Sequence, residues 1–334
     1  MNELHAILAA ITTPALGGRV LCTLVHTAGS SYRRPGARML VLADGTRIGS
    51  ISGGCLEEDA IARAVVVART GRAELVVYDT TSENDLVWGV GLGCHGVVQV
   101  LLEKLPAAPA WAHVAAENLR ASRPTPLAVV WKSDDPALLG THLAEALPAS
   151  RAGTEVFHDT LPPPVPLIIF GAGDDALPLV RFAKDLGWHV TVGDARPAFA
   201  TGERFPLADH VPIVRPEEPL SSQGIALGPQ SVVVVMTHHY VHDKPLLRQL
   251  LPQPLAYLGL LGPKKRAEQI VRDLAAEGAH FTAAQLSRLR APVGLDLGGE
   301  AAGEIALSIV AEIRAVLAGR DARPLREREG PIHG

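Results

Sequence analysis

Two patterns of apolar and polar positions divide the chain near residue 165. Before this point, short apolar runs alternate with glycine-rich loops, which predicts a mixed α/β domain. After it, apolar strands alternate with helical segments, and this order predicts a parallel sheet with helices on both faces. The expected domains are residues 1–160 and 165–320, followed by a tail at 321–334.

The first domain is expected to hold a core over residues 1–104 and a Pro- and Ala-rich connecting segment up to residue 160. In the Pro- and Ala-rich residues 105–165, Arg123-Pro-Thr-Pro126 and Leu161-Pro-Pro-Pro164 read as linkers, the second stiff and extended. Asp44-Gly45 between two apolar runs predicts a β-hairpin. The predicted helices are 2–14 and 56–70, and the predicted strands are 19–26, 37–43, 46–51, 74–78, 97–102 and 127–131.

The second domain opens on a strand that enters the turn Gly171-Ala172-Gly173 and then a helix. Gly171 permits the turn, and Gly173 lets backbone amides approach a pyrophosphate at the helix start. Asp194 ends the next strand, where a Rossmann fold places a carboxylate on a ribose hydroxyl. The pattern predicts a Rossmann-like, doubly wound sheet. Its predicted strands are 167–170, 189–193, 231–237 and 256–261, its helices 174–186, 243–251, 263–277 and 301–318, and residues 290–300 resemble a further strand and loop.

Polar groups follow two later strands of this sheet. Thr237 and His238 come after an apolar strand, at the edge where ligands of open α/β sheets bind. Lys264, Lys265 and Arg266 gather at a helix start, an arrangement that attracts anions. A solvated histidine and a solvated basic face are the plainer alternatives.

Two acids complicate phosphate binding at the glycine turn. Asp174 and Asp175 place negative charges where a phosphate would sit, and like charges repel. Asp174 can also be read as an ordinary helix cap. The spacing of His238, His239 and His242 matches no standard zinc pattern.

Two cysteines lie in glycine-rich loops. Cys55 follows Ser52, Gly53 and Gly54 and precedes a predicted helix, whose positive end favours a thiolate. Cys94 follows Gly93 in a second loop of this kind. Both are candidate reactive thiols, although free cysteine is often only a small buried hydrophobe and Gly-Gly only a tight turn. Cys22 lies in an apolar run and is predicted to be core.

Composition narrows the class of protein. With 47% hydrophobic residues and a net charge of −4, the chain is globular and has no basic stripe for nucleic acid. Its start has no basic region and no apolar run is long enough for a membrane span, so neither a signal peptide nor a membrane partner is expected. Three cysteines make no disulfide framework, and a cytoplasmic location is expected.

Several of these motifs together resemble one family. In order along nearly the whole chain, the resemblance is carried by Thr27-Ala-Gly-Ser-Ser31, Pro35-Gly36, Gly49–Glu57, Gly91-Leu-Gly-Cys94, Gly171-Ala-Gly173, Met236-Thr-His238, Gly259-Leu-Leu-Gly262 and Ala291–Asp296. The chain is identified by them as similar to the XdhC/CoxI family of xanthine dehydrogenase accessory proteins. The resemblance implies an N-terminal family domain and a C-terminal Rossmann domain.

The resemblance also implies a function. Such proteins bind molybdenum cofactor, protect it while a sulfido ligand replaces an oxo ligand, and insert it into xanthine dehydrogenase or a related molybdenum hydroxylase. It implies a homodimer and contact with a cysteine desulfurase. The cofactor that the resemblance implies is molybdopterin, in its plain or its dinucleotide form. The chain departs from the family pattern at Asp174, where histidine is usual, at His95, where glycine is usual, and at His239, where an acid is common.

In chemical terms, thiolates suit soft metal and sulfur chemistry. Cys55 could ligate molybdenum, carry a persulfide or only shape its loop, and the Lys264–Arg266 cluster suits the cofactor's terminal phosphate. Two other classes stay open. One is an NAD(P)-dependent oxidoreductase that uses the Rossmann half, and the other is a non-catalytic scaffold that docks desulfurase and hydroxylase.

Overall fold

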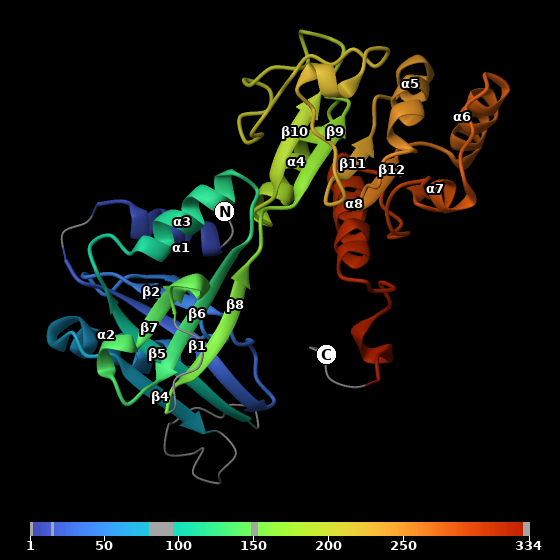
Figure 1. The fold of residues 1–334 in the computed structure, drawn as a ribbon. Coiled ribbons are helices and arrows are strands. Elements are labelled where there is room, and N and C mark those ends of the chain that lie inside the picture. The colour runs from blue at the N-terminus through green and yellow to red at the C-terminus, as the bar shows by residue number, and fades with distance from the viewer. Residues whose placement is uncertain (1–2, 15–16, 80–95, 148–152, 330–334) are drawn as a thin grey trace. The chain divides into compact units, whose positions relative to one another are not determined.

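The computed structural model describes residues 3–14, 17–79, 96–147 and 153–329. It divides into two compact units, Met1–Pro163 and Pro164–Gly334, each with its own sheets and cores (Figure 1). The predicted fold class is confirmed, since a mixed α/β unit precedes a parallel sheet of Rossmann type. In the described ranges no helix combines the length and apolar character that a membrane crossing requires.

The N-terminal unit contains two antiparallel sheets, with strand orders β3-β2-β1-β5-β4 and β7-β6-β8. Its strands are β1 (Arg19–Gly29), β2 (Arg38–Val41), β3 (Arg47–Gly49), β4 (Glu74–Asp79), β5 (Gly96–Leu105), β6 (Thr125–Lys132), β7 (Gly140–Leu143) and β8 (Glu155–Leu161). Its helices are α1 (Glu3–Thr12), α2 (Glu57–Thr70) and α3 (Ala110–Arg120), with 3-10 turns at Pro136–Leu138 and Ala144–Ala146.

Strand β1 is the buried centre of the larger sheet, which explains its unbroken apolar run. Successive side chains of a strand point to opposite faces. Cys22 and Leu24 therefore pack under α2 on one face. Leu21 packs with α1 and α3 on the other. A strand covered on both faces needs apolar residues at consecutive positions.

The predicted hairpin at Asp44-Gly45 is confirmed. Strands β2 and β3 pair antiparallel, with Val41 opposite Arg47. The Asp44 carboxylate accepts the amide of Thr46 at 2.9 Å, and Gly45 has φ +82°, a backbone conformation that glycine adopts without penalty. Beyond β3 the chain enters the loop that carries Cys55.

Of the two predicted linkers, Arg123–Pro126 is wrong, because Thr125 and Pro126 lie in β6, and α3 and the whole of the smaller sheet lie within residues 110–161. Leu161–Pro164 does connect the two units, whose boundary falls between Pro163 and Pro164. Pro126 lies opposite Thr160 of β8 and one residue outside the ladder with β7, which covers Leu127–Val130 of β6. Only one of β6's two ladders therefore includes this proline.

Two buried polar contacts join the sheets of the N-terminal unit. Arg38 Nη1 of β2 donates to the Asp159 carboxylate of β8 at 2.8 Å. The Nε and Nη2 atoms of Arg38 are buried without a hydrogen-bond partner. Glu103 of β5 accepts the amide of Thr141 of β7 at 2.9 Å. Burial raises the pKa of Glu103, despite the hydrogen bonds that Thr141 donates to it.

The C-terminal unit is built on one parallel sheet with the order β10-β9-β11-β12-β13. Its strands are β9 (Pro166–Phe170), β10 (His189–Gly193), β11 (Val232–Val235), β12 (Tyr257–Leu260) and β13 (Leu289–Arg290). Its helices are α4 (Ala176–Asp185), α5 (Tyr240–Leu250), α6 (Lys264–Ala276), α7 (Ala283–Ser287) and α8 (Ala302–Leu317), with 3-10 turns at Leu220–Gln223 and Leu325–Glu327.

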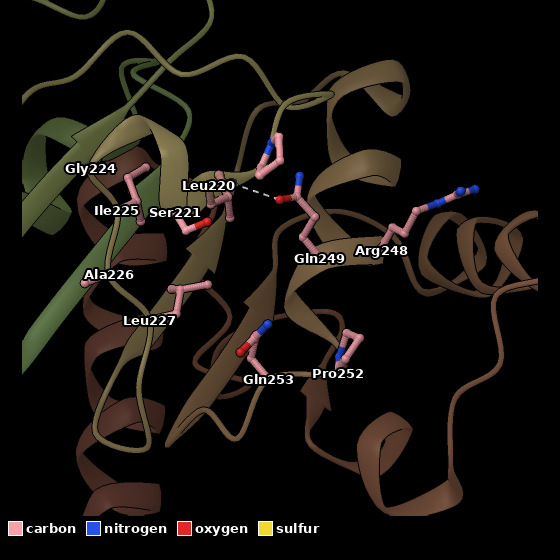
Figure 2. A pocket seen from close by; sticks show the side chains of 11 residues that line it. Leu220, Ser221, Gly224, Ile225, Ala226, Leu227, Arg248, Gln249, Pro252 and Gln253 are labelled. Carbon is pink, nitrogen blue, oxygen red and sulfur yellow. Dashed lines mark hydrogen bonds between the residues drawn. The ribbon is translucent and has the colours of Figure 1, made fainter.

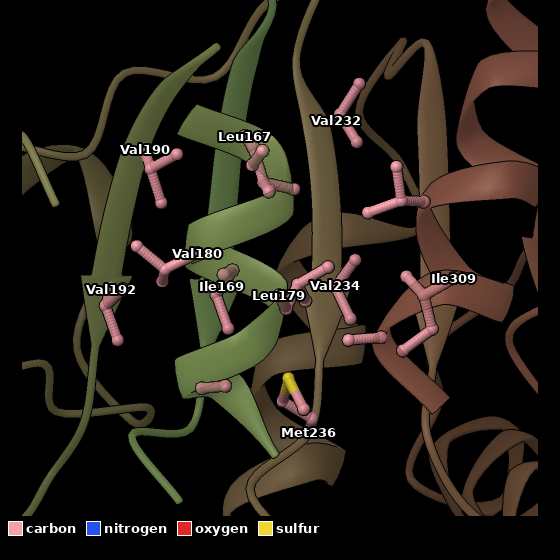
Figure 3. Close-up of a cluster of buried hydrophobic side chains, with 14 of the residues drawn as sticks. Leu167, Ile169, Leu179, Val180, Val190, Val192, Val232, Val234, Met236 and Ile309 are labelled. Atoms are coloured by element: carbon pink, nitrogen blue, oxygen red, sulfur yellow. The ribbon is translucent and has the colours of Figure 1, made fainter. Parts of the chain in front are cut away.

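Helices cover both faces of this sheet, as the sequence predicts. Leu167 and Ile169 of β9 pack against α4 and α8 (Figure 3). Ile168 and Phe170 pack on the opposite face, in the cluster that α5 and α6 complete. Each fully buried side chain of this kind stabilises the unit by about 1.5–3 kcal/mol.

The strand order of this unit locates its crevice. The chain passes from β9 outward to β10 and then returns to β11 on the other side of β9. The connections therefore leave the carboxyl ends of β9 and β11 in opposite directions, and ligands of such sheets bind at this switch point. Gly171 follows β9 and Thr237 follows β11, so the motifs predicted at strand ends do meet at this edge.

Candidate functional site

The first candidate site is the loop Ser50–Leu56, between β3 and α2. The Cys55 thiol is half-buried, and its Sγ lies 3.5 Å from Ser52 Oγ. Gly53 and Gly54 are exposed. Gly54 has φ +115° with open space where a side chain would be. The loop thus presents bare backbone beside a partly accessible sulfur.

Glu57 occupies the amides at the centre of this loop. Its carboxylate accepts the backbone N–H groups of Ile51 at 3.1 Å, Ser52 at 2.8 Å and Leu56 at 3.2 Å, and also the Ser52 hydroxyl. Burial alone would raise the pKa of Glu57, but these hydrogen bonds outweigh it and lower the pKa. A carboxylate of the protein itself therefore occupies these amides.

Ser52 completes the internal bonding of the loop. Its hydroxyl oxygen accepts the amides of Gly54 and Cys55, each at 3.1 Å. The predicted cradle residues Ser52, Gly53, Gly54 and Cys55 are thus brought together. The amides of Ser52, Gly54 and Cys55 bond within the loop rather than point outward.

Tyr32 is a residue that the sequence patterns do not single out. Its side chain is 66% exposed. A methyl group placed on Gly53 would contact three atoms of the Tyr32 ring at 3.4 Å each, so the ring lies flat over this glycine. Arg33, next in the chain, donates to Ser50 Oγ at 3.3 Å. No local signal identifies Tyr32, because the contact joins residues far apart in sequence.

The other cysteines differ from Cys55. Cys94, with Gly93 and His95, lies outside the described residues. Cys22 is fully buried, as predicted for core, and burial raises the pKa of its thiol to about 12. A thiol with so high a pKa is almost entirely protonated at neutral pH and is chemically inert.

The second candidate site is the glycine turn after β9. Gly171 has φ +117°, and a Cβ there would lie 2.4 Å from the carbonyl oxygen of Met236. Only glycine fits this position, which lets β9 and β11 leave the sheet side by side. Around Gly173 there is open space. The turn therefore has the geometry that the sequence predicts.

Asp194 is committed to holding this turn. One carboxylate oxygen accepts the Ala172 amide at 2.7 Å and Arg196 Nη2 at 2.8 Å, and the other accepts the Arg196 amide and Nε at 2.8 and 2.9 Å. Four donors fill the lone-pair positions of a carboxylate. Burial would raise the pKa of Asp194, but the bonds from Arg196 and Ala172 lower it to about 2. In this arrangement no position is left for a ribose hydroxyl.

Each acid after Gly173 has a cationic partner or a histidine. Arg204 Nη2 donates to the Asp174 carboxylate, and Arg204 Nε donates to the Ala172 carbonyl at 3.1 Å. His238 Nε2 lies 3.0 Å from the Asp175 carboxylate. His238 is held at φ +60°, which is uncommon for a residue with a side chain. The repulsion expected from these acids is thus offset locally.

Thr237 and the predicted basic cluster are linked through one buried acid. Thr237 Oγ1 donates to the Asp243 carboxylate at 2.5 Å, and Arg266 Nη2 donates to its other oxygen. Burial raises the pKa of Asp243, although Thr237 and Arg266 act against this shift. Arg266 therefore turns inward, whereas Lys264 and Lys265 are exposed. The predicted three-residue cluster is in fact two exposed lysines and one internal arginine.

Two hollows of the C-terminal unit differ in size and position. At the crevice, a hollow between Asp194, Arg196 and Thr237 has a volume of about 10 Å³, which is room for one water. A hollow of about 720 Å³ lies before β11 and β12, at the other end of these strands, where Gln249 accepts the Leu220 amide at 3.0 Å (Figure 2). Among the described residues, no group of three His, Cys, Asp or Glu side chains could hold a metal.

Comparisons with known proteins agree with both halves of this description. The model of the XdhC Rossmann domain matches residues 167–313, and that of the XdhC and CoxI family matches residues 17–79. A relative from Bacillus subtilis, described as a probable xanthine dehydrogenase component, is 34% identical over 332 residues, which cover 94% of this chain and 97% of the relative.

Two further relatives extend the comparison. The molybdenum cofactor insertion chaperone PaoD of Escherichia coli is 26% identical over 90% of this chain and 83% of its own length. A crystal structure described as a xanthine dehydrogenase from Bacillus halodurans has a TM-score of 0.79 and 31% identity, with 98% of both chains covered. The likeness therefore spans both units.

Proposed function

Because this chain belongs to the XdhC/CoxI family of xanthine dehydrogenase accessory proteins, we propose that it binds molybdenum cofactor and helps insert it into a molybdenum hydroxylase. The observation that carries the proposal is the likeness over both units to a molybdenum cofactor insertion chaperone and to a probable xanthine dehydrogenase component. The cofactor is then cargo, received from one protein and delivered to another.

The loop around Cys55 is the proposed contact for the metal end of this cargo. A half-buried thiol beside exposed Gly53 and Gly54 can approach a dithiolene-bound molybdenum closely, and thiolates suit such soft metal and sulfur chemistry. The exposed ring of Tyr32 offers an apolar face on which a planar pterin could stack. Cys55 would ligate molybdenum or carry sulfur during sulfuration, and Cys94 is the second candidate thiol.

The Cys55 loop offers few free donors to an anion, because its Ser52 and Cys55 amides are already bonded to Glu57 and Ser52. In the C-terminal unit, Lys264 and Lys265 are exposed at the first turn of α6, where the helix dipole also favours an anion. We propose that these two lysines bind a phosphate group. Arg266 contributes indirectly, since its guanidinium is bound to Asp243.

Insertion requires partners. We propose a molybdenum hydroxylase such as xanthine dehydrogenase as the acceptor, a cysteine desulfurase as the source of sulfur, and a homodimer in the cytoplasm as the working form. Protection of the cofactor during sulfuration belongs to the same proposal.

A nicotinamide-dependent oxidoreductase is the second candidate function, favoured by the Rossmann topology and the glycine turn. Against it stands the Asp194 carboxylate, whose acceptor positions are filled by Ala172 and Arg196. A scaffold without cofactor binding is the third. Fluorescence titration with NADH and NADPH, with an assay of turnover, separates the second candidate from the other two.

The test is direct binding of the cargo. Purified apo-protein is incubated with molybdenum cofactor, and pterin and molybdenum are measured in the protein peak after gel filtration. Wild type is expected to retain the cofactor in near-stoichiometric amount, and Cys55→Ala is expected to lose it. The matched control is Ser50→Ala, which changes the same loop but leaves the sulfur. Absence of binding by wild type would overturn the proposal.

A further inference from the structure

The glycine turn of the C-terminal unit holds an ion pair that resembles an occupied phosphate site. Turns of this kind present amides and a helix N-terminus to a phosphate group. Here Asp174, the first residue after Gly173, places its carboxylate against the guanidinium of Arg204. The Asp174 side chain is 89% exposed, whereas that of Arg204 is 27% exposed. The acid is therefore free to leave, while the arginine is held.

Several contacts fix Arg204 in place. Its Nε donates to the Ala172 carbonyl inside the turn at 3.1 Å. Its guanidinium carbon lies 5.3 Å from the ring centre of Phe199 and 5.7 Å from that of Phe205. An arginine held by a carbonyl and two rings loses little further freedom when it binds an anion, which favours binding.

The other two acids near Arg204, Asp194 and Asp175, are paired with other residues, so an anion could replace Asp174 at Arg204. Arg196 neutralises Asp194, and its guanidinium carbon lies 3.8 Å from the ring centre of Phe199, the same ring that Arg204 approaches. Asp175 is bound to His238 rather than to Arg204. Of the three acids Asp174, Asp175 and Asp194, only Asp174 has a largely exposed carboxylate. Its partner, Arg204, also donates to the Ala172 carbonyl of the turn.

We propose that Arg204 is the phosphate-binding residue of the glycine turn and that the Asp174 carboxylate occupies its place until a nucleotide pyrophosphate displaces it. Gly173, with open space around it, lets that group approach the turn. The proposal goes beyond the function proposed above, because the ligand could be the nucleotide of a dinucleotide cofactor or a free nucleotide. Their shared chemistry is a pyrophosphate ester.

The charge change at Asp174 gives the sharpest test. Asp174→Asn removes the competing carboxylate and should strengthen binding of inorganic pyrophosphate by about 3- to 10-fold, the range expected when one exposed ion pair and one like charge are removed. Arg204→Gln should abolish this binding. Misfolding cannot raise the affinity of Asp174→Asn for pyrophosphate. This variant therefore tests the proposal even if Arg204→Gln is too unstable to be measured.

Matched variants in the same unit control for net charge. Glu277 pairs with Lys244 and Arg248 away from the turn, so Glu277→Gln and Arg248→Gln repeat the two charge changes there. Isothermal titration with inorganic pyrophosphate, ADP, CDP and NAD⁺ compares all five proteins. The nucleotide that binds more tightly than pyrophosphate identifies the source of the ligand.

The proposal is supported if Asp174→Asn binds pyrophosphate more tightly than both wild type and Glu277→Gln. It is overturned if Asp174→Asn matches Glu277→Gln, if Arg204→Gln binds as wild type does, or if no probe binds at millimolar concentration. Pterin retention by the wild type is measured separately. Failure here therefore leaves the function proposed above with its own test.

Discussion

The Glu57 carboxylate accepts three backbone amides and the Ser52 hydroxyl, so one side chain organises the loop that carries Cys55. Buried amides that lose their acceptor cost much more than an average hydrogen bond contributes. The loop is therefore preorganised by the protein itself, and Cys55 is presented from a fixed backbone. A mobile loop would have to lose conformational entropy on each encounter with the cargo.

Replacing Glu57 tests this role. Glu57→Ala should lower the free energy of unfolding by about 2–3 kcal/mol, because it leaves buried amides without an acceptor. Glu58→Ala, which removes the exposed neighbouring acid, should change it by less than about 0.5 kcal/mol. Urea unfolding followed by circular dichroism measures both. Equal effects of the two substitutions would show that Glu57 has no special part.

Asp194 gives a prediction about pH. Its pKa falls from the ordinary 3.8 to about 2 in the folded chain, so its ionised form stabilises the fold. That stability is complete above the unfolded value of 3.8 and is lost as the pH falls toward 2. Asp194→Asn should thus be destabilised relative to wild type at pH 7, and the gap should narrow below about pH 3.8 in urea titrations. A gap that stays constant down to about pH 2.5 would contradict this linkage.

At the scale of elements, β9 and β11 approach so closely at their carboxyl ends that Gly171 lies against the backbone of Met236. This contact fixes the width of the crevice at the switch point. The following residue of the turn, Ala172, is tied to β10 through Asp194. Three strands are therefore fastened together at the one edge where ligands of such sheets bind.

The two glycines of the turn should respond differently to a methyl group. Gly171→Ala combines a positive φ with a Cβ 2.4 Å from a carbonyl oxygen, and should cost at least about 2 kcal/mol of unfolding free energy. Gly173→Ala meets open space and should stay within about 1 kcal/mol. Thermal unfolding of both variants measures the two losses of stability. The account of the turn fails if Gly173→Ala is the more damaging.

The two sheets of the N-terminal unit are coupled through Arg38 and Asp159. A double-mutant cycle with Arg38→Met and Asp159→Asn should give a coupling of about 1–3 kcal/mol, since Asp159→Asn takes the counter-charge from the buried Arg38 and Arg38→Met takes it from the half-buried Asp159. Lys132 and Glu155 form an exposed pair in the smaller sheet, and their cycle should give less than about 1 kcal/mol. Additive effects in the first cycle would mean that this pair does not join the sheets.

At the scale of the whole molecule, the sequence predicts what depends on local pattern. The strand, turn and helix around Gly171 and the hairpin at Gly45 follow from neighbouring residues. The smaller sheet is only partly predicted, because prolines obscure its short strands. The partner of Asp174 could not be predicted, because Arg204 lies 30 residues away along the chain and no motif marks it.

Both units match the same family, so the central claim concerns the whole chain rather than one site. The proposed activity of the protein is the delivery of cofactor. Neither the Cys55 loop nor the Rossmann sheet by itself indicates this activity. A binding protein that never releases its cargo would pass every stability test above.

The most direct measurement is therefore transfer. Protein loaded with molybdenum cofactor is mixed with an apo-form of a molybdenum hydroxylase such as xanthine dehydrogenase, and molybdenum in the hydroxylase is quantified after the two are separated. The account predicts faster and more complete transfer from loaded wild type than from free cofactor, with little transfer from Cys55→Ala. Equal transfer with and without this protein would contradict it.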